Sequence, residues 1–124
     1  MGNGRKRNMV KKIFTPKKGD IIRLSFDPQA DHEQSGWRPG LVISNSTFNL
    51  ATGFCVVCPI TNTDRGYPFH VPVKNVPKIS GVIMVDQVKS LDYISKKASL
   101  ISKADPDIME EVMAIYFAII SDDV

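Results

Sequence analysis

The chain has 124 residues, the length of one domain, and 43% of them are hydrophobic, which argues against disorder of the whole chain. The net charge of +3 is unevenly divided: residues 1–18 hold seven Lys or Arg and no acid, whereas the rest holds nine basic and thirteen acidic residues. Binding of nucleic acid to this acidic body would depend on locally placed cations. No apolar stretch reaches the roughly 18 residues of a membrane-spanning helix, so we expect a cytoplasmic protein.

The pattern of apolar runs and turn residues predicts several short strands. Residues 1–16 are expected to be a basic, flexible extension, and residues 17–124 a single domain. Residues 46–53 are expected to be a connector with one helical turn at 49–52. The expected strands cover residues 21–26, 40–45, 54–60, 69–73, 81–88 and about 98–101.

A helix is predicted at the end of the chain. Asp105 is a suitable N-cap and Pro106 suits the first helical position. An apolar stripe at helical spacing is expected to pack on the sheet or to form an interface. The stripe consists of Ile108, Val112, Ile115, Tyr116, Ile119 and Ile120. Short strands followed by one helix predict a mainly β domain, a small and strongly curved barrel.

The two cysteines, Cys55 and Cys58, form a C-x-x-C pattern that suggests a metal or redox site. No second Cys or His pair supplies the other zinc ligands, and positions three apart on a strand face opposite sides. We therefore expect two reduced packing residues and no metal site.

The polar loop between the first two expected strands concentrates groups that suit anion binding and proton transfer. It holds His32, Glu33, Trp37 and Arg38. Long ordered loops are often functional, although a solvated hairpin tip is the alternative.

Four motifs resemble the MazF/PemK/ChpB toxins, small endoribonucleases of toxin–antitoxin pairs. They are GDIIRLSFDP (19–28), HEQSGWRPGLVIS (32–44), CPITNTDRGYPF (58–69) and GVIMVDQVKSLD (81–92), in the order of the family. The resemblance covers residues 17–120 and implies the SH3-like barrel of the MazF/CcdB class. It also implies a homodimer whose loops border one RNA channel, and a MazE/PemI-like antitoxin that lays an acidic segment across the RNA site.

Metal-free RNA cleavage requires a base for the ribose 2′-hydroxyl, a held phosphate, stabilised charge and an acid for the leaving 5′-oxygen. The sequence lacks the dense carboxylate cluster of two-metal nucleases. We therefore expect no cofactor and no metal, and products with 2′,3′-cyclic phosphate and 5′-hydroxyl ends.

Arg38 and Thr61 are the first catalytic candidates. Arg38 can hold a phosphate in a fork, and the resemblance assigns a catalytic role to the arginine of its RP pair. Thr61 ends the Pro59-Ile60-Thr61 motif, where the family has a catalytic or phosphate-holding hydroxyl. A surface ion pair and a turn-capping hydroxyl are the respective alternatives.

His32, Glu33 and Asp86 are further catalytic candidates. In the PemK/Kid branch, the histidine of HEQ and the aspartate of a DQ pair are implicated in catalysis, with an arginine two residues before the aspartate. Met84 stands in the place of that arginine, which puts the acid–base scheme of the branch in doubt. His32 suits proton transfer near neutral pH, and Glu33 suits either a base or a partner of Arg38. Asp86 has an alternative role in holding RNA bases.

Further residues are candidates for RNA binding. Trp37 and Tyr67 suit stacking on single-stranded bases, or else they pack against the barrel. Arg65 and Lys89 are candidate phosphate contacts, and Gln87 belongs to the polar DQ pair.

Together the motifs predict a toxin that is a sequence-selective, ribosome-independent endoribonuclease of single-stranded mRNA. The alternative is a non-catalytic, CcdB-like binding toxin that acts on DNA gyrase. The RP pair and the Pro-x-Thr motif favour the enzyme, since a gyrase binder does not need them. A third possibility is a degenerate member that only sequesters RNA or antitoxin.

Overall fold

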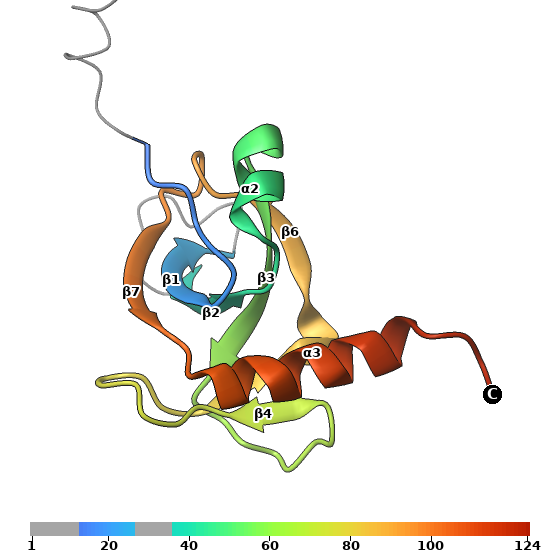
Figure 1. Ribbon diagram of the computed structural model, residues 1–124. Coiled ribbons are helices and arrows are strands. Elements are labelled where there is room, and N and C mark those ends of the chain that lie inside the picture. The colour runs from blue at the N-terminus through green and yellow to red at the C-terminus, as the bar shows by residue number, and fades with distance from the viewer. Residues whose placement is uncertain (1–12, 27–35) are drawn as a thin grey trace, which may run out of the picture.

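The computed structural model describes residues 13–26 and 36–124, which form a strongly curved antiparallel sheet with helices beside it (Figure 1). The elements are β1 (Asp20–Ser25), β2 (Trp37–Val42), α2 (Ser46–Thr52), β3 (Phe54–Thr61), β4 (His70–Pro72), β5 (Val82–Met84), the 3₁₀ turn η2 (Val85–Gln87), β6 (Lys89–Asp92), β7 (Ser99–Lys103) and α3 (Pro106–Ile120).

The long strand β3 organises the sheet. The strand order is β4-β5-β3-β2-β1-β7, and β6 also pairs with β3. β6 pairs with Phe54–Val57 at the start of β3, whereas β5 pairs with Ile60 and Thr61 at its end. Pro59, which lacks a backbone donor, lies in the interval between these two ladders. The predicted mainly β fold is confirmed, as an open sheet.

The predicted continuous strand at residues 81–88 is wrong. The chain forms β5, turns through η2 and continues as β6. Both strands use β3, and η2 carries the chain from one ladder to the other. The polar pair Asp86 and Gln87 therefore lies in an exposed turn, so these two polar side chains are not buried within a strand.

Two other element predictions need correction at their boundaries. β2 begins at Trp37 rather than at residue 40, so Arg38 lies within a strand. The helical turn expected at 49–52 is the seven-residue helix α2, because the Asn45 side chain accepts a 2.9 Å bond from the Phe48 amide and begins the helix earlier.

The hydrophobic core has two clusters on the two faces of the sheet. One contains Ile21, Leu41 and Cys58 with residues of α3; the other contains Ile22, Val42 and Cys55. Neighbours on a strand divide between the clusters because successive side chains point to opposite faces. Both cysteines are free and fully buried, as predicted.

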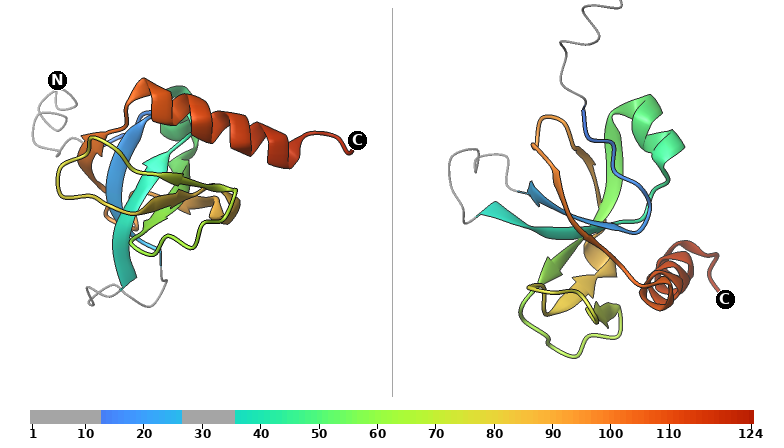
Figure 2. Two further views of the ribbon diagram at one scale, coloured as in Figure 1. Left: turned by 90° about the horizontal axis from the view of Figure 1, so that it is seen from below. Right: turned by 60° about the vertical axis from the view of Figure 1, so that its left-hand side comes forward.

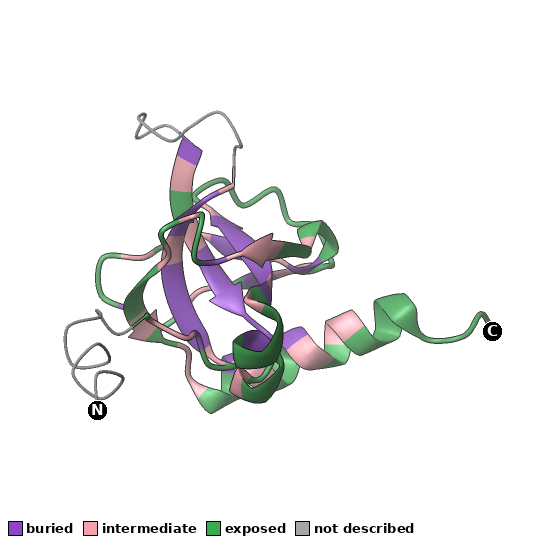
Figure 3. Cartoon of the chain, turned by 90° about the horizontal axis from the view of Figure 1, so that it is seen from above, coloured by how far each residue is buried: buried purple, intermediate pink, exposed green. Residues whose placement is uncertain are grey.

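Helix α3 packs on the sheet as far as Tyr116. Ile108 and Val112 are buried in the core, whereas Phe117, Ile119 and Ile120 are exposed on the last turns, which extend past the strands (Figures 2 and 3). The prediction that the stripe packs on the sheet is thus confirmed for Ile108, Val112, Ile115 and Tyr116.

Asp105 occupies the N-cap position of α3, but its side chain makes no capping bond. The Asp105 carboxylate instead accepts a 2.8 Å hydrogen bond from the side-chain amide of Asn75. Within the described residues, no helix is long and apolar enough to cross a membrane.

Candidate functional site

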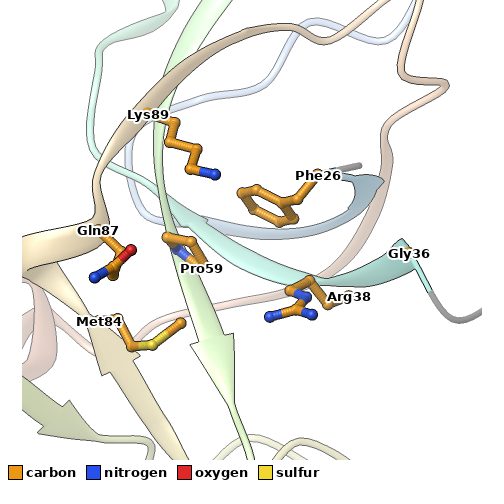
Figure 4. Close-up of a pocket in the computed structure, with 7 residues that line it drawn as sticks. All are labelled: Phe26, Gly36, Arg38, Pro59, Met84, Gln87 and Lys89. Carbon is orange, nitrogen blue, oxygen red and sulfur yellow. The ribbon is translucent and has the colours of Figure 1, made fainter. Parts of the chain in front are cut away.

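Two adjoining cavities lie where β2, the end of β3 and η2 meet, and they share Arg38, Met84 and Gln87. We call them together the groove. The first measures about 280 Å³ and is also lined by Phe26, Gly36, Pro59 and Lys89 (Figure 4). The second measures about 270 Å³ and is also lined by Thr61, Thr63, Arg65, Tyr67, His70 and Asp86.

The first cavity combines cationic, polar and apolar side chains. Arg38 comes from β2 and Lys89 from β6, and Figure 4 shows both extending beside Pro59 at the centre. Phe26, directly after β1, forms an apolar wall. A Cβ on Gly40 would lie 3.0 Å from its ring and 2.6 Å from Cγ2 of Val57, so glycine is needed for this packing.

The second cavity brings a hydroxyl, cations and a carboxylate together. Thr61 is the last residue of β3, and its Oγ1 accepts a 3.3 Å bond from the Thr63 amide. Gly81, with φ of +109°, lies against the Thr61 backbone so closely that a Cβ there would overlap the Thr61 carbonyl. This glycine therefore allows β5 to approach the end of β3.

Asp86 contacts a residue that the sequence analysis did not single out. His70 Nε2 lies 3.1 Å from Asp86 Oδ1, and the His70 ring lies 5.0 Å from the Tyr67 ring between centroids. The sequence signal was a histidine at the start of a strand, directly after the polar segment that holds Tyr67. Its partner is 16 positions away, so the contact follows from the pairing of β4 with β5.

Trp37 is the predicted site residue that the structure places away from the groove. It precedes Arg38 on β2, so the two side chains leave opposite faces of the strand. The Arg23 guanidinium lies 4.6 Å from the centroid of the Trp37 ring, a cation–π contact.

The remaining candidates divide between the groove and the segment that is not described. Tyr67, Arg65, Gln87 and Lys89 line the groove with Arg38, Thr61 and Asp86. His32 and Glu33 lie outside the described residues. No group of three or more His, Cys, Asp or Glu side chains in the described part of the chain is placed to hold a metal ion.

The chain matches, over residues 17–115, the family described as PemK-like, MazF-like toxins of type II toxin–antitoxin systems. It is 35% identical to the endoribonuclease toxin MazF of Escherichia coli K12, over 82% of this chain and 90% of that protein. It is 38% identical to the endoribonuclease toxin ChpB of the same strain, over 85% and 93%.

Solved structures of MazF proteins have a similar fold. A crystal structure of MazF from Deinococcus radiodurans superposes with a TM-score of 0.78 at 37% identity, covering 86% of this chain and 97% of that chain. A MazE–MazF structure from the same organism gives 0.77 at 31%, covering 90% and 100%.

This chain belongs to the PemK-like, MazF-like toxin family. The resemblance predicted from the motifs is thereby confirmed, and the predicted class, endoribonuclease, is the one that the curated relatives carry in their names.

This MazF-like chain has Met84 at the position where the PemK/Kid resemblance implied an arginine. Met84 is the last residue of β5 and lines both cavities. A thioether brings no positive charge, so within the described residues Arg38 and Arg65 are the guanidinium groups that line the groove.

Proposed function

We propose that this protein is the toxin of a toxin–antitoxin pair and a sequence-selective, ribosome-independent endoribonuclease that cleaves single-stranded mRNA in the cytoplasm. The observation that carries the proposal is the convergence of Arg38, Thr61 and Asp86 on one groove from three different elements. Family membership and the names of the relatives support the same activity.

The cleavage route that these side chains support is metal-free attack by the ribose 2′-hydroxyl. The Arg38 guanidinium holds the phosphate and balances the charge that develops on its oxygens, and the Thr61 hydroxyl donates to one of those oxygens. Asp86, with His32 or Glu33, serves the proton transfers. The products are a 2′,3′-cyclic phosphate and a 5′-hydroxyl.

The rest of the groove suits a single strand. The Tyr67 ring is half exposed and available for stacking on a base, while Arg65 and Lys89 face the backbone phosphates. Gln87 lies between the cavities and has the donors and acceptor that read a base edge.

We further propose that a MazE/PemI-like antitoxin occupies the same groove with an acidic segment. The cations Arg38, Arg65 and Lys89 supply complementary charge. The existence of a MazE–MazF complex for a similar protein supports this partner.

The test replaces the two central groups. Arg38→Ala and Thr61→Ala should each lower the rate of cleavage roughly 10²-fold or more, because each removes a donor to the reacting phosphate. Arg38→Lys should recover only part of the loss, since an ammonium lacks the fork. Cut sites are mapped by sequencing RNA 5′ ends, and rates are measured on an oligonucleotide containing one mapped site.

Lys96→Ala removes a cation from the turn between β6 and β7, away from the groove, and serves as the matched control. Cleavage in EDTA should continue at the same rate. Unimpaired cleavage by folded Arg38→Ala would refute the assignment, whereas loss in EDTA that Mg²⁺ restores would replace the metal-free route. A folded wild-type protein that cuts no RNA would favour the binding-toxin alternative.

A further inference from the structure

His70 is almost completely buried although it lies beside the groove. Its side chain is 5% exposed, whereas the side chain of its partner Asp86 is 35% exposed. His70 begins β4 and pairs across the ladder with Met84, two residues before Asp86. A substrate in the groove therefore meets the carboxylate first, with the imidazole behind it.

The two ring nitrogens of His70 have different surroundings. Nε2 lies 3.1 Å from Asp86 Oδ1, whereas Nδ1 is buried and has no hydrogen-bond partner in the described part of the chain. A proton on Nε2 makes a donor to the carboxylate and leaves a lone pair on Nδ1. A proton on Nδ1 would bury an unpaired N–H, which proteins avoid more strictly than an unpaired acceptor.

Surrounding contacts fix the ring in this position. The His70 amide donates a 3.1 Å bond to the Tyr67 carbonyl, and the Tyr67 ring packs on the imidazole. On the other side, the Val85 amide donates a 3.2 Å bond to the Phe69 carbonyl and ties η2 to the start of β4. Donor and carboxylate are thus held on two elements that are bonded to each other.

We propose that His70 is a positioning residue for catalysis: it donates Nε2–H to Asp86 Oδ1 and holds the carboxylate in the orientation in which it meets the RNA. This inference rests on the proposed endoribonuclease activity. The bond leaves Asp86 Oδ2 for the substrate and restrains the carboxylate from turning toward Arg38 or Arg65, the guanidinium groups that line the same cavity. His70 would thus act as the hydrogen-bonding groups behind metal ligands act in other proteins, by fixing the orientation of the side chain in front of it.

The first test compares two amides at position 70. In His70→Gln the terminal NH₂ reaches the place of Nε2, whereas the shorter side chain of His70→Asn reaches only the place of Nδ1. On an RNA oligonucleotide with a mapped cut site, His70→Asn should lower kcat about 10-fold or more, with KM changed less than about 3-fold. His70→Gln should recover most of kcat.

A double-mutant cycle shows whether His70 acts through Asp86. In the Asp86→Ala background, His70→Asn should cause no further loss of kcat, because the group that it positions is gone. Thermal unfolding of each variant separates loss of orientation from loss of fold.

A spectroscopic readout needs no activity. The chain has two histidines, so the imidazole nitrogen spectrum contains two sets of signals, and His70→Gln identifies those of His70. Nε2 of His70 should carry the proton, and its signal should shift in Asp86→Ala.

The inference would be overturned if folded His70→Asn were as active as wild type, or if the Nε2 signal did not shift in Asp86→Ala. Either result would leave the proposed function intact. Wild-type protein that cuts no RNA, with an Nε2 signal that shifts in Asp86→Ala, would overturn the proposed function and with it the role of His70 in positioning a catalytic carboxylate.

Discussion

Trp37 and Arg38 are neighbours in β2 with different surroundings. Arg38 lines the groove, whereas Trp37 packs with Arg23 on the opposite face. Cys55 and Cys58 differ in the same way, because each belongs to a different core cluster. At the residue scale, alternation along a strand decides which side chains meet the groove and which meet the core.

Burial of the thiols has a consequence for stability. Burial raises the pKa of Cys55 to about 12, and burial together with the charge of Asp86 raises the pKa of Cys58 to about 12. Unfolded thiols lose their protons near pH 8.5. The folded state therefore binds more protons between about pH 8.5 and 12, and the free energy of unfolding should fall as pH rises through this range.

Urea unfolding between pH 8 and 10 measures this effect. Each thiol contributes up to about 1.4 kcal/mol per pH unit to the slope, and the double variant Cys55→Ala/Cys58→Ala should lose that contribution. Equal slopes for the two proteins would contradict thiols that stay protonated in the fold.

Residue types and motifs predicted most of the groove but not its full membership. Arg38 and Thr61 were predicted because each belongs to a short family motif, the RP pair and Pro59-Ile60-Thr61, which local sequence carries. His70 was missed because its role depends on Asp86, which only the pairing of β4 with β5 brings close. Trp37 was assigned to the site because the start of β2 was placed three residues too late, which hid its orientation.

At the element scale, η2 is the connection that shapes the groove. It allows β5 and β6 to share β3, and it places Asp86 and Gln87 in the turn between them. The sequence predicted one long strand here because the apolar run from residue 82 to 85 continues the period of a strand. A move from one ladder of β3 to the other leaves no mark on that period.

Gly81 should be the glycine of this region that tolerates a side chain least. Its φ of +109° and its contact with Thr61 predict that Gly81→Ala lowers the free energy of unfolding by at least about 1–3 kcal/mol and also reduces cleavage, by displacing Thr61. Gly53→Ala is the control, because Gly53 also has a positive φ but open space around it.

Chemical denaturation of both variants gives the comparison, with RNA cleavage as the second readout. Gly53→Ala should cost about 1 kcal/mol and leave cleavage unchanged. A Gly81→Ala variant as stable and active as Gly53→Ala would show that the close contact between Gly81 and Thr61 does not require glycine.

For the whole molecule, the exposed end of α3 bears on the homodimer that the family resemblance implies. The Phe117 side chain is 70% exposed and Ile120 59%, which is costly for a helix end in water. We propose that a second copy of the chain covers this surface, which would bring two grooves into one particle.

Phe117→Lys should therefore shift the protein from dimer toward monomer, because it places a charge in an apolar contact. Light scattering after gel filtration should give twice the 13.8 kDa of one chain for wild type and less for the variant. Glu110→Lys, on an exposed position nearer the start of α3, is the matched control. An unchanged mass for Phe117→Lys would place the dimer contact elsewhere.

β3 pairs with β5 through fewer residues than β1 pairs with β2. Arg38 lies on the long β1–β2–β3 ladder, whereas His70 lies on β4, and the described pairing joins that strand's neighbour β5 to β3 through Ile60 and Thr61. A ladder of two residue pairs opens locally at a lower free energy than one of five. Asp86 follows β5 in η2, so the separation between the Arg38 guanidinium and the Asp86 carboxylate depends on this short ladder. Opening at the end of β3 would alter the shape of the proposed RNA groove, and because Ile60 and Ile83 belong to one core cluster, it would loosen that cluster as well.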